Sequence, residues 1–325
     1  MSIRCKAWVM TQTGGPEVIQ KAEIELPEPG IGQVLIRVVA AGFNPVDTKI
    51  RAGLAAIAPQ SGVLGCDVSG YIEATGEGVS ALSPGDAVYG CAGGVKGHHG
   101  ALAEYMVADA DLLAPAPHNL PLEDCAGLPI AAITAYNAVQ RLQLQAGERL
   151  FVVGASGAVG LMMTQIAHQL GALVEGSAGS RERIAQVEAF GGRGWLHSQC
   201  SELVAQGESF ARVLDTFGGA GLQTALELAA PYAQVATINA RNQYDLSQAH
   251  AKALTLHAIF MLLPLLRQEH MAAHGECLRV LTAGIEAGEL QGLPVQRFAM
   301  SEVAQIHARY EAGELPFKAV MLPDF

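Results

Sequence analysis

The sequence is poor in charged and aromatic residues, which make up only 16% and 6% of its 325 residues. Positive charge is the scarcer sign: 20 Lys and Arg face 31 Asp and Glu, for a net charge of −11. This balance disfavours nucleic acid and anionic membranes as main partners, because both reward basic patches. The most apolar run, 254–266, is too short to span a bilayer and contains Pro264.

The N-terminal segment MSIRCKAWVM lacks the apolar stretch of a signal peptide, so we expect a cytoplasmic protein. There is no C-x-x-C pair, and the cysteine spacing matches no zinc module. These features predict reduced, mostly buried thiols and exclude a disulfide framework. The six cysteines are at positions 5, 66, 91, 125, 200 and 277.

The segment 149–183 carries the clearest signal. An apolar run stops at Gly154 of GASGAVG, a helical pattern follows over 159–170, and a second apolar run leads to GSAGSRER. Strand, glycine turn, helix and strand in this order are typical of the unit that binds a dinucleotide pyrophosphate at a helix N-terminus. The alternative is a tight strand-to-helix turn without a ligand. The predicted contacts are Ala155, Ser156, Gly157, Ala158 and Val159.

The turn after the second strand indicates which dinucleotide is bound. An NAD site usually ends this strand with an acidic residue that bonds the ribose hydroxyls. Here the turn contains Ser177, Ser180 and Arg183, and a guanidinium suits a 2′-phosphate. Glu175 lies about three positions too early but leaves NAD open. The sequence therefore favours NADPH.

The chain has the length of two domains. Up to about residue 120, turn signals separate short β-prone runs, which predicts an antiparallel, barrel-like domain. Strand and helix patterns alternate from there to about 270, and the last ~50 residues return to a strand-containing pattern. We expect a β-rich domain from 1–122 plus 273–325, and a Rossmann domain over 123–272 inserted into it. Such an arrangement predicts a cleft between the two.

Several segments, in this order, resemble the medium-chain dehydrogenase/reductase superfamily, and its zinc-free, zeta-crystallin-like quinone oxidoreductase branch in particular. The resemblance covers nearly the whole chain. It implies an α/β protein in which a doubly wound parallel Rossmann sheet is inserted in a GroES-like barrel domain. The matching segments are AAGFNPVDTKIRAG, GCDVSGYI, SPGDAVYG, GALAEY, LPIAAITAYNAV, the glycine loop, GSAGSRER, VLDTFGG and FKAVML.

The zinc-free branch is indicated by the residues at the ligand positions of zinc-dependent members. Where those carry a cysteine, this chain has Asn44, and where they carry a His–Glu pair it has Cys66 and Asp67. A four-cysteine lobe is also missing from the sequence. Zinc needs three or four convergent ligands, so we expect no metal and interpret Cys66 and Asp67 as structural. The pair His98-His99 leaves a metal site as an alternative to an exposed loop.

Without zinc the expected chemistry is hydride delivery from NADPH to an electron-poor acceptor, a quinone or an α,β-unsaturated carbonyl. The resemblance places Asn44 at the nicotinamide and the substrate, where its amide could donate to the acceptor oxygen; alternatively it only holds its loop. Asp47 is expected to orient the loop or Lys49, since an unperturbed aspartate is ionised at pH 7.

Further contacts are implied by the resemblance, with a packing role as the alternative for each. Relatives carry a tyrosine after the segment that ends here at Gly53, and another near the 2′-phosphate; this chain has Leu54 and Ser198 there. The first departure puts the usual quinone pocket in doubt. The implied cofactor contacts are Asn44, Thr134, Phe217, Gly218, Asn239 and Lys318.

Two segments bear on assembly. The apolar run 254–266 is interpreted as a helix kinked by Pro264, in the core or at a dimer contact. QVATINA (234–240) is interpreted as an edge strand that extends the sheet across a twofold axis, so a homodimer is expected. Alternatives to a quinone or enone reductase are an enoyl-thioester or alkenal reductase, and a non-catalytic NADPH-binding protein.

Overall fold

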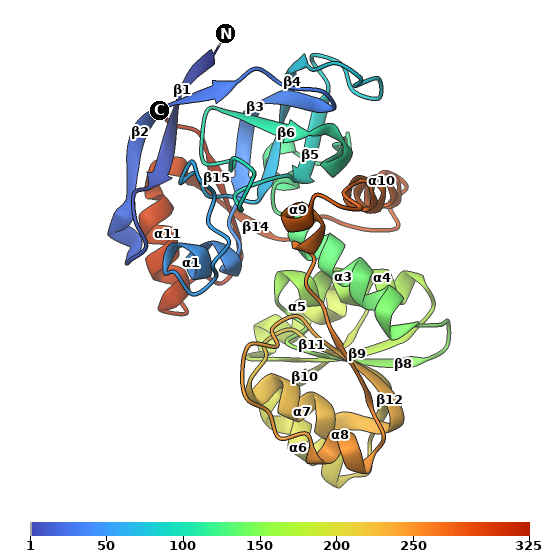
Figure 1. The fold of residues 1–325 in the computed structure, drawn as a ribbon. Coiled ribbons are helices and arrows are strands. Elements are labelled where there is room, and N and C mark those ends of the chain that lie inside the picture. The colour runs from blue at the N-terminus through green and yellow to red at the C-terminus, as the bar shows by residue number, and fades with distance from the viewer. Residues whose placement is uncertain (1) are drawn as a thin grey trace. The chain divides into compact units, whose positions relative to one another are not determined.

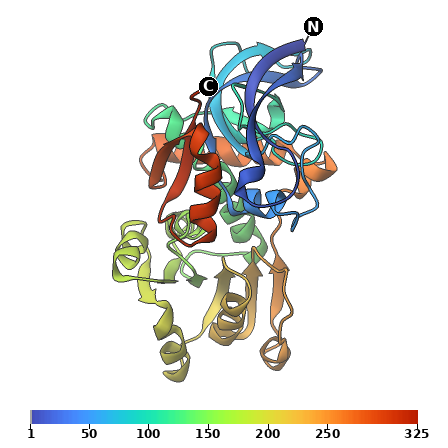
Figure 2. The same cartoon turned by 90° about the vertical axis from the view of Figure 1, so that its left-hand side faces the viewer.

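The protein is described over residues 2–325 by a computed structural model, in which it divides into two compact units. Unit 1 comprises the chain up to Ile130 and from Leu262 onward, and unit 2 comprises Ala131–Met261. The divisions differ from the predicted 122 and 273 because helix α2 and the segment after 261 pack within unit 1. Figure 1 and Figure 2 show the blue N-terminal and red C-terminal segments together in unit 1.

Unit 1 is built around a β-sheet of order β14-β15-β3-β4-β5-β7, with β6 paired to β3 and a separate hairpin β1-β2. All its strand pairs are antiparallel except β14-β15. Its strands are β1 Ser2–Met10, β2 Ile19–Pro27, β3 Gln33–Gly42, β4 Asp67–Thr75, β5 Ala87–Cys91, β6 Tyr105–Asp109, β7 Leu113–Pro115, β14 Val295–Ala299 and β15 Lys318–Leu322. Its helices are α1 Pro45–Arg51, α2 Leu122–Cys125, α9 Leu263–Arg267, α10 Ala272–Glu286 and α11 Val303–Glu311.

Unit 2 is a six-stranded parallel sheet of order β10-β9-β8-β11-β12-β13. Helices α4 and α5 cover one face, and α6, α7 and α8 cover the other (Figure 1). Its strands are β8 Arg149–Val153, β9 Leu173–Ala178, β10 Arg193–Leu196, β11 Phe210–Asp215, β12 Ala229–Thr237 and β13 Thr255–Ala258. Its helices are α3 Pro129–Leu142, which begins at the unit boundary, α4 Ala158–Gln169, α5 Arg181–Ala189, α6 Cys200–Ala205, α7 Ala220–Leu228 and α8 Ser247–Ala251.

The predicted doubly wound sheet is confirmed, and its centre follows from composition. A parallel sheet covered on both faces needs strands that are apolar on both sides. Strand β8, RLFVV, meets this requirement, because its last four residues are buried. Phe151 stacks against Phe210 of the neighbouring β11 with 4.8 Å between ring centroids.

Two predictions about the far edge of this sheet are wrong. QVATINA lies in β12, which is paired on both sides, so it is not the edge strand. The run 254–266 is not a kinked helix: it forms β13 and then α9, at whose first turn Pro264 stands. Proline fits a helix start because the missing N–H has no partner there. The edge is therefore β13. Among residues 2–325, no helix has the length and apolar character needed to cross a bilayer.

Candidate functional site

Three strands of unit 1 bring distant residues together by register. Gly42, at the end of β3, pairs with Asp67 at the start of β4 and with Val320 of β15. Lys318 begins β15, two residues before that pairing. A Cβ on Gly42 would lie 2.0 Å from the Ala126 carbonyl oxygen, so only glycine allows this approach. The register thus places an acid and a base, 251 positions apart in sequence, beside each other.

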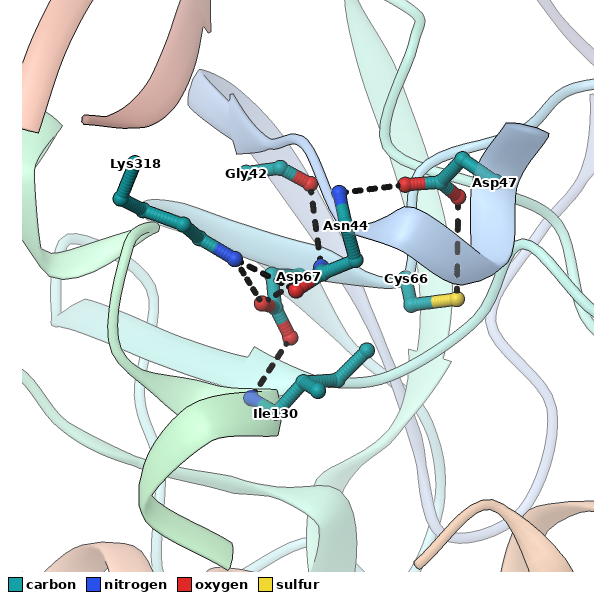
Figure 3. Close-up of polar contacts among 7 residues, drawn as sticks. All are labelled: Gly42, Asn44, Asp47, Cys66, Asp67, Ile130 and Lys318. Atoms are coloured by element: carbon teal, nitrogen blue, oxygen red, sulfur yellow. Dashed lines mark hydrogen bonds and ion pairs between the residues drawn. The ribbon is translucent and has the colours of Figure 1, made fainter. Parts of the chain in front are cut away.

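Asp67 is the centre of the resulting cluster, which we call the Asp67 cluster: Asn44, Asp67 and Lys318 (Figure 3). The Asn44 amide donates to Asp67 Oδ2 at 2.8 Å, and it also donates to the Gly42 carbonyl oxygen at a longer distance of 3.4 Å. Lys318 Nζ donates to Asn44 Oδ1 and lies 3.4 Å from Asp67 Oδ2. The Ile130 N–H donates to Asp67 Oδ1 at 3.1 Å.

This geometry bears on the predicted donor role of Asn44. A primary amide has two N–H donors, and both find acceptors inside the protein. An ammonium has three donors, and the contacts of Lys318 in the described chain engage two of them. The side chains of Lys318 and Asp67 are only 6% and 0% exposed. The group with a hydrogen-bond donor left for a ligand is therefore Lys318, not Asn44.

Asp47 fixes the loop that carries Asn44. Its Oδ2 accepts a hydrogen bond from the Asn44 N–H at 2.8 Å, and its Oδ1 lies 4.0 Å from the Cys66 thiol (Figure 3). This contact starts helix α1, because a carboxylate three residues into a helix satisfies a free N–H at its end. The predicted role in orienting the loop is confirmed.

Burial dominates the electrostatics of this region. It raises the pKa of Asp47 to about 7, and it raises that of Asp67 against the opposing ammonium of Lys318. Burial also raises the pKa of the Cys66 and Cys91 thiols well above the usual range, so both stay protonated. The pKa of Asp47 therefore differs from that of an unperturbed aspartate, because the carboxyl is buried.

The glycine loop of unit 2 has the form of a phosphate cradle. Gly154 has φ of +82°, and Gly157 starts α4 without a side-chain cap. A Cβ on Gly157 would have only one neighbour, the Gly154 carbonyl oxygen at 3.6 Å, so space lies open on that side. The uncapped helix end supplies partial positive charge for an anion. The part-exposed residues of this turn are Ser156, Ala158 and Val159. The Ala155 N–H is not available to a ligand, because it donates to the Ser177 carbonyl. The residues fit a dinucleotide pyrophosphate.

Two of the three glycines of this loop, Gly157 and Gly160, are expected to respond differently to alanine. A Cβ on Gly160 would lie 2.4 Å from the Gly154 carbonyl oxygen, so Gly160→Ala should destabilise the protein by about 1–3 kcal/mol. The matched control Gly157→Ala has room, and should keep the melting temperature of the wild type while weakening dinucleotide binding. Thermal unfolding and calorimetric titration check this. Equal melting temperatures for both variants would contradict the packing argument.

At the turn after β9, some of the residues predicted to select the dinucleotide are bonded within the protein and others are accessible. Glu175 is engaged elsewhere: Arg149 and Trp195 donate to its two oxygens at 2.6 and 2.9 Å. Ser177 is also internal, because its buried hydroxyl accepts from the Gly154 N–H at 3.4 Å. Ser180 caps α5, with its oxygen accepting from the Arg183 N–H, and the Arg183 side chain is exposed. Of the predicted set, Ser180 and Arg183 remain accessible.

The predicted contacts at the carboxyl edge of the sheet form one network. Buried Asp215 at the end of β11 accepts from the Phe217 and Gly218 N–H groups at 2.9 and 2.8 Å. The Asn239 amide donates to the Phe217 carbonyl at 2.7 Å. Phe217 is 57% exposed, so this network holds an aromatic side chain outward at the edge where ligands bind doubly wound sheets. Thr134 is buried in α3.

The histidine pair does not form a metal site with its surroundings. His98 Nε2 lies 3.1 Å from the Leu265 carbonyl oxygen, and its Nδ1 lies 3.7 Å from Asp109. Burial lowers the pKa of His99. Within residues 2–325, no three His, Cys, Asp or Glu side chains converge as a ligand set.

Sequence reasoning missed the central position of Asp67. The available signal was a carboxylate at the start of the apolar segment GCDVSGYI, since a buried charge requires a partner. It also missed His197, because the register of β10 was not visible in the sequence.

Comparison with known proteins agrees with the geometry. Residues 30–118 match the family model of the alcohol dehydrogenase GroES-like domain. The chain is 31% identical to the quinone oxidoreductase of Rattus norvegicus over 304 residues, which cover 90% of each protein. It is 38% identical to the chloroplastic NADPH-dependent alkenal/one oxidoreductase of Arabidopsis thaliana over 195 residues, which span 57% of this chain and 50% of that relative.

A solved structure extends the likeness to the whole fold. An alcohol dehydrogenase superfamily protein from Novosphingobium aromaticivorans superposes with a TM-score of 0.91 at 31% identity. The match covers 98% of this chain and 100% of that one. A likeness of this extent places both units, not only the glycine loop, within one known architecture.

Proposed function

Because the chain belongs to the medium-chain dehydrogenase/reductase superfamily, in the branch of the quinone oxidoreductases, we propose that it transfers hydride from NADPH to a quinone or α,β-unsaturated carbonyl. Membership makes it an oxidoreductase; the cofactor, the acceptor and the site residues are parts of the proposal. Bound NADPH would supply the hydride. The protein's residues bind and orient the reactants.

The observation that carries the proposal is the Asp67 cluster. Zinc-dependent relatives place metal ligands at the positions of Asn44 and Cys66, and here an amide and a buried thiol stand there. The positive charge at this place comes instead from the ammonium of Lys318, held by Asn44 and Asp67. An ammonium that is held in place before the reaction can donate to an oxygen that gains negative charge as hydride arrives.

Each member of the cluster then has a distinct task. Lys318 donates to the acceptor oxygen, Asp67 pairs with its ammonium in a buried place, and Asn44 aligns it. Asp47 holds the loop of Asn44 through the backbone. Such a site favours acceptors that are already electron-poor, because an ammonium polarises a carbonyl more weakly than a metal ion does.

The preference for NADPH is supported by the turn after β9. Glu175, the residue that would have favoured NAD, is bonded to Arg149 and Trp195. Of the residues predicted to bind here, Ser180 is part-exposed and Arg183 is exposed, a hydroxyl and a guanidinium suited to a 2′-phosphate. The plant relative bears NADPH dependence in its name.

The alternatives use the same hydride and differ in the acceptor. An enoyl-thioester reductase or an alkenal reductase would retain the Asp67 cluster but contact the substrate differently. The plant alkenal/one relative favours the alkenal reductase of these two. A non-catalytic NADPH-binding protein is the remaining alternative. Pocket shape decides among acceptors, and Leu54, 75% exposed where relatives carry a tyrosine, is one difference that would alter it.

The test is oxidation of NADPH and NADH by the chelator-treated protein with quinones, enones, alkenals and enoyl-thioesters. We expect NADPH-selective turnover of quinones or enones that survives chelation. Loss of activity on chelation, with recovery on adding zinc, would contradict the metal-free chemistry. NADPH binding without turnover of any acceptor would support the non-catalytic alternative.

We further propose a cytoplasmic homodimer formed through β13. This strand ends the sheet of unit 2, and Leu256 and Phe260 at this edge are 40% and 44% exposed. An edge strand with apolar side chains can pair with a second copy across a twofold axis. Light scattering at micromolar concentration should give twice the chain mass of 33.9 kDa. A monomer mass would refute the proposal.

A further inference from the structure

His197 directly follows strand β10. The register of β10 against β9 places it beside the turn that follows β9. Strand β10 pairs in parallel with β9, so that Trp195 stands opposite Ser177 and Leu196 opposite Ala178. His197 therefore comes level with Gly179, in the turn that carries Ser180 and Arg183. A Cβ on Gly179 would lie 4.0 Å from His197 Nε2, so the imidazole stands directly over this glycine.

The ring of His197 is fixed in orientation. Its Nδ1 lies 3.0 Å from Ser177 Oγ, and its ring meets Phe217 edge to face with 5.7 Å between centroids. Because Ser177 engages Nδ1, Nε2 is the ring nitrogen left for a ligand, and it carries a proton whenever the ring is protonated. This nitrogen and the exposed ring edge lie beside the turn of Ser180 and Arg183.

We propose that His197 is a specificity-determining residue that binds the 2′-phosphate of NADPH together with Arg183 and makes the preference for NADPH depend on pH. This inference rests on the proposed use of NADPH. The ribose end of a dinucleotide lies at the carboxyl end of the second strand, which is the end of β9. Among residues 2–325, the neighbouring Ser198, to which the sequence assigned this contact, has no hydrogen bond to the turn, whereas His197 Nε2 lies beside Gly179.

The charged surroundings set the direction of the pH effect. Partial burial and the nearby Arg183 guanidinium lower the pKa of free His197 below its ordinary 6.5. The Cys200 thiol also contacts Ser177, and burial raises its pKa, so it stays neutral. A bound phosphate dianion raises the pKa of an adjacent imidazole. Binding is thus tightest when the ring is protonated, and weakens as pH rises from the free pKa through the bound one.

The experiment is calorimetric titration with NADP⁺ and NAD⁺ from pH 6 to 8.5, because these ligands test binding without turnover. For the wild type, the affinity for NADP⁺ should fall as pH rises over this range, by at most about tenfold, the full factor for a one-unit rise in the pKa of His197 on binding. The affinity for NAD⁺, which lacks the 2′-phosphate, should change less than about twofold.

Variants separate the charge of His197 from its shape. His197→Gln keeps a side chain that can bond Ser177 but carries no charge, and should flatten the pH dependence for NADP⁺. His197→Lys stays charged and should bind NADP⁺ at pH 8.5 as tightly as the wild type binds at pH 6. Ser198→Ala is the matched control and should behave as the wild type. Any residual slope in His197→Gln measures titration of the phosphate itself.

The outcomes distinguish this inference from the proposed function. If His197→Gln is folded and retains the wild-type slope and affinity for NADP⁺, His197 does not read the phosphate, and NADPH use stands. If the wild type binds NAD⁺ at least as tightly as NADP⁺ at every pH, the proposed cofactor is wrong. A slope lost equally for both ligands would assign His197 to the shape of the turn and overturn the specificity role.

Discussion

Replacing Lys318 with methionine is expected to lower kcat/KM for quinones or enones about 100-fold, while the affinity for NADPH stays within a few-fold of the wild type. Removal of one preorganised donor to a developing oxyanion typically costs this much. Within the described residues Lys318 donates to Asn44 and Asp67, so a ligand oxygen is the group that would use its remaining hydrogen. Steady-state kinetics and NADPH titration measure the two quantities.

A control must separate this effect from misfolding. Loss of Lys318 leaves Asp67 buried without its cation, which is costly unless the carboxyl takes up a proton. The double variant Lys318→Met with Asp67→Asn removes both charges and should recover thermal stability without recovering activity. Lys252→Met is the matched lysine control, because Lys252 lies in unit 2 and donates to the carbonyls of Leu226 and Glu227. A folded Lys318→Met enzyme with wild-type kcat/KM would exclude the donor role.

Arg183→Ala is expected to weaken NADPH binding at least about tenfold and to leave NADH binding nearly unchanged. A hydrogen bond to a charged group contributes roughly 1.5–3 kcal/mol, and only NADPH carries the phosphate that uses it. Arg183 lies exposed on the first turn of α5, whose N-terminal end also favours an anion. Fluorescence titration with both reduced dinucleotides gives the two dissociation constants.

The control for Arg183 is a second arginine of the same unit. Arg193 is exposed as well, but it stacks on Trp195 and lies near Glu175, toward the start of β10 and away from the turn. Arg193→Ala makes the same change in net charge and should leave the ratio of NADPH to NADH affinity intact. Equal losses of both dinucleotides in Arg183→Ala would rule out the assignment of the 2′-phosphate to this turn.

Much of the fold was predictable from short stretches of sequence. The strand, glycine turn and helix over 149–170 depend on neighbouring residues, and the structure has them as β8 and α4. The strand-containing pattern expected over the last ~50 residues is likewise present, as β14 and β15. In each, apolar periodicity and turn residues act locally, so the sequence contains the required information.

For the segment 254–266, the local sequence pattern did not determine the secondary structure. Its apolar residues suit a buried helix as well as a strand, since periodicity alone does not separate the two in a short apolar run. The pairing of β13 with β12 decides the outcome by satisfying its backbone groups. This pairing also determines which strand lies at the edge of the sheet.

The candidate site divides in the same way. The sequence by itself determined the family, the glycine loop and the basic turn, because those residues are close neighbours along the chain. Only the tertiary structure decided that Asp67 holds Lys318, that Glu175 is bonded to Arg149 and Trp195, and that His197 rather than Ser198 faces Gly179. Each of these contacts joins residues from different elements. Strand register sets their partners, and register is fixed by the packing of the whole sheet rather than by adjacent residues.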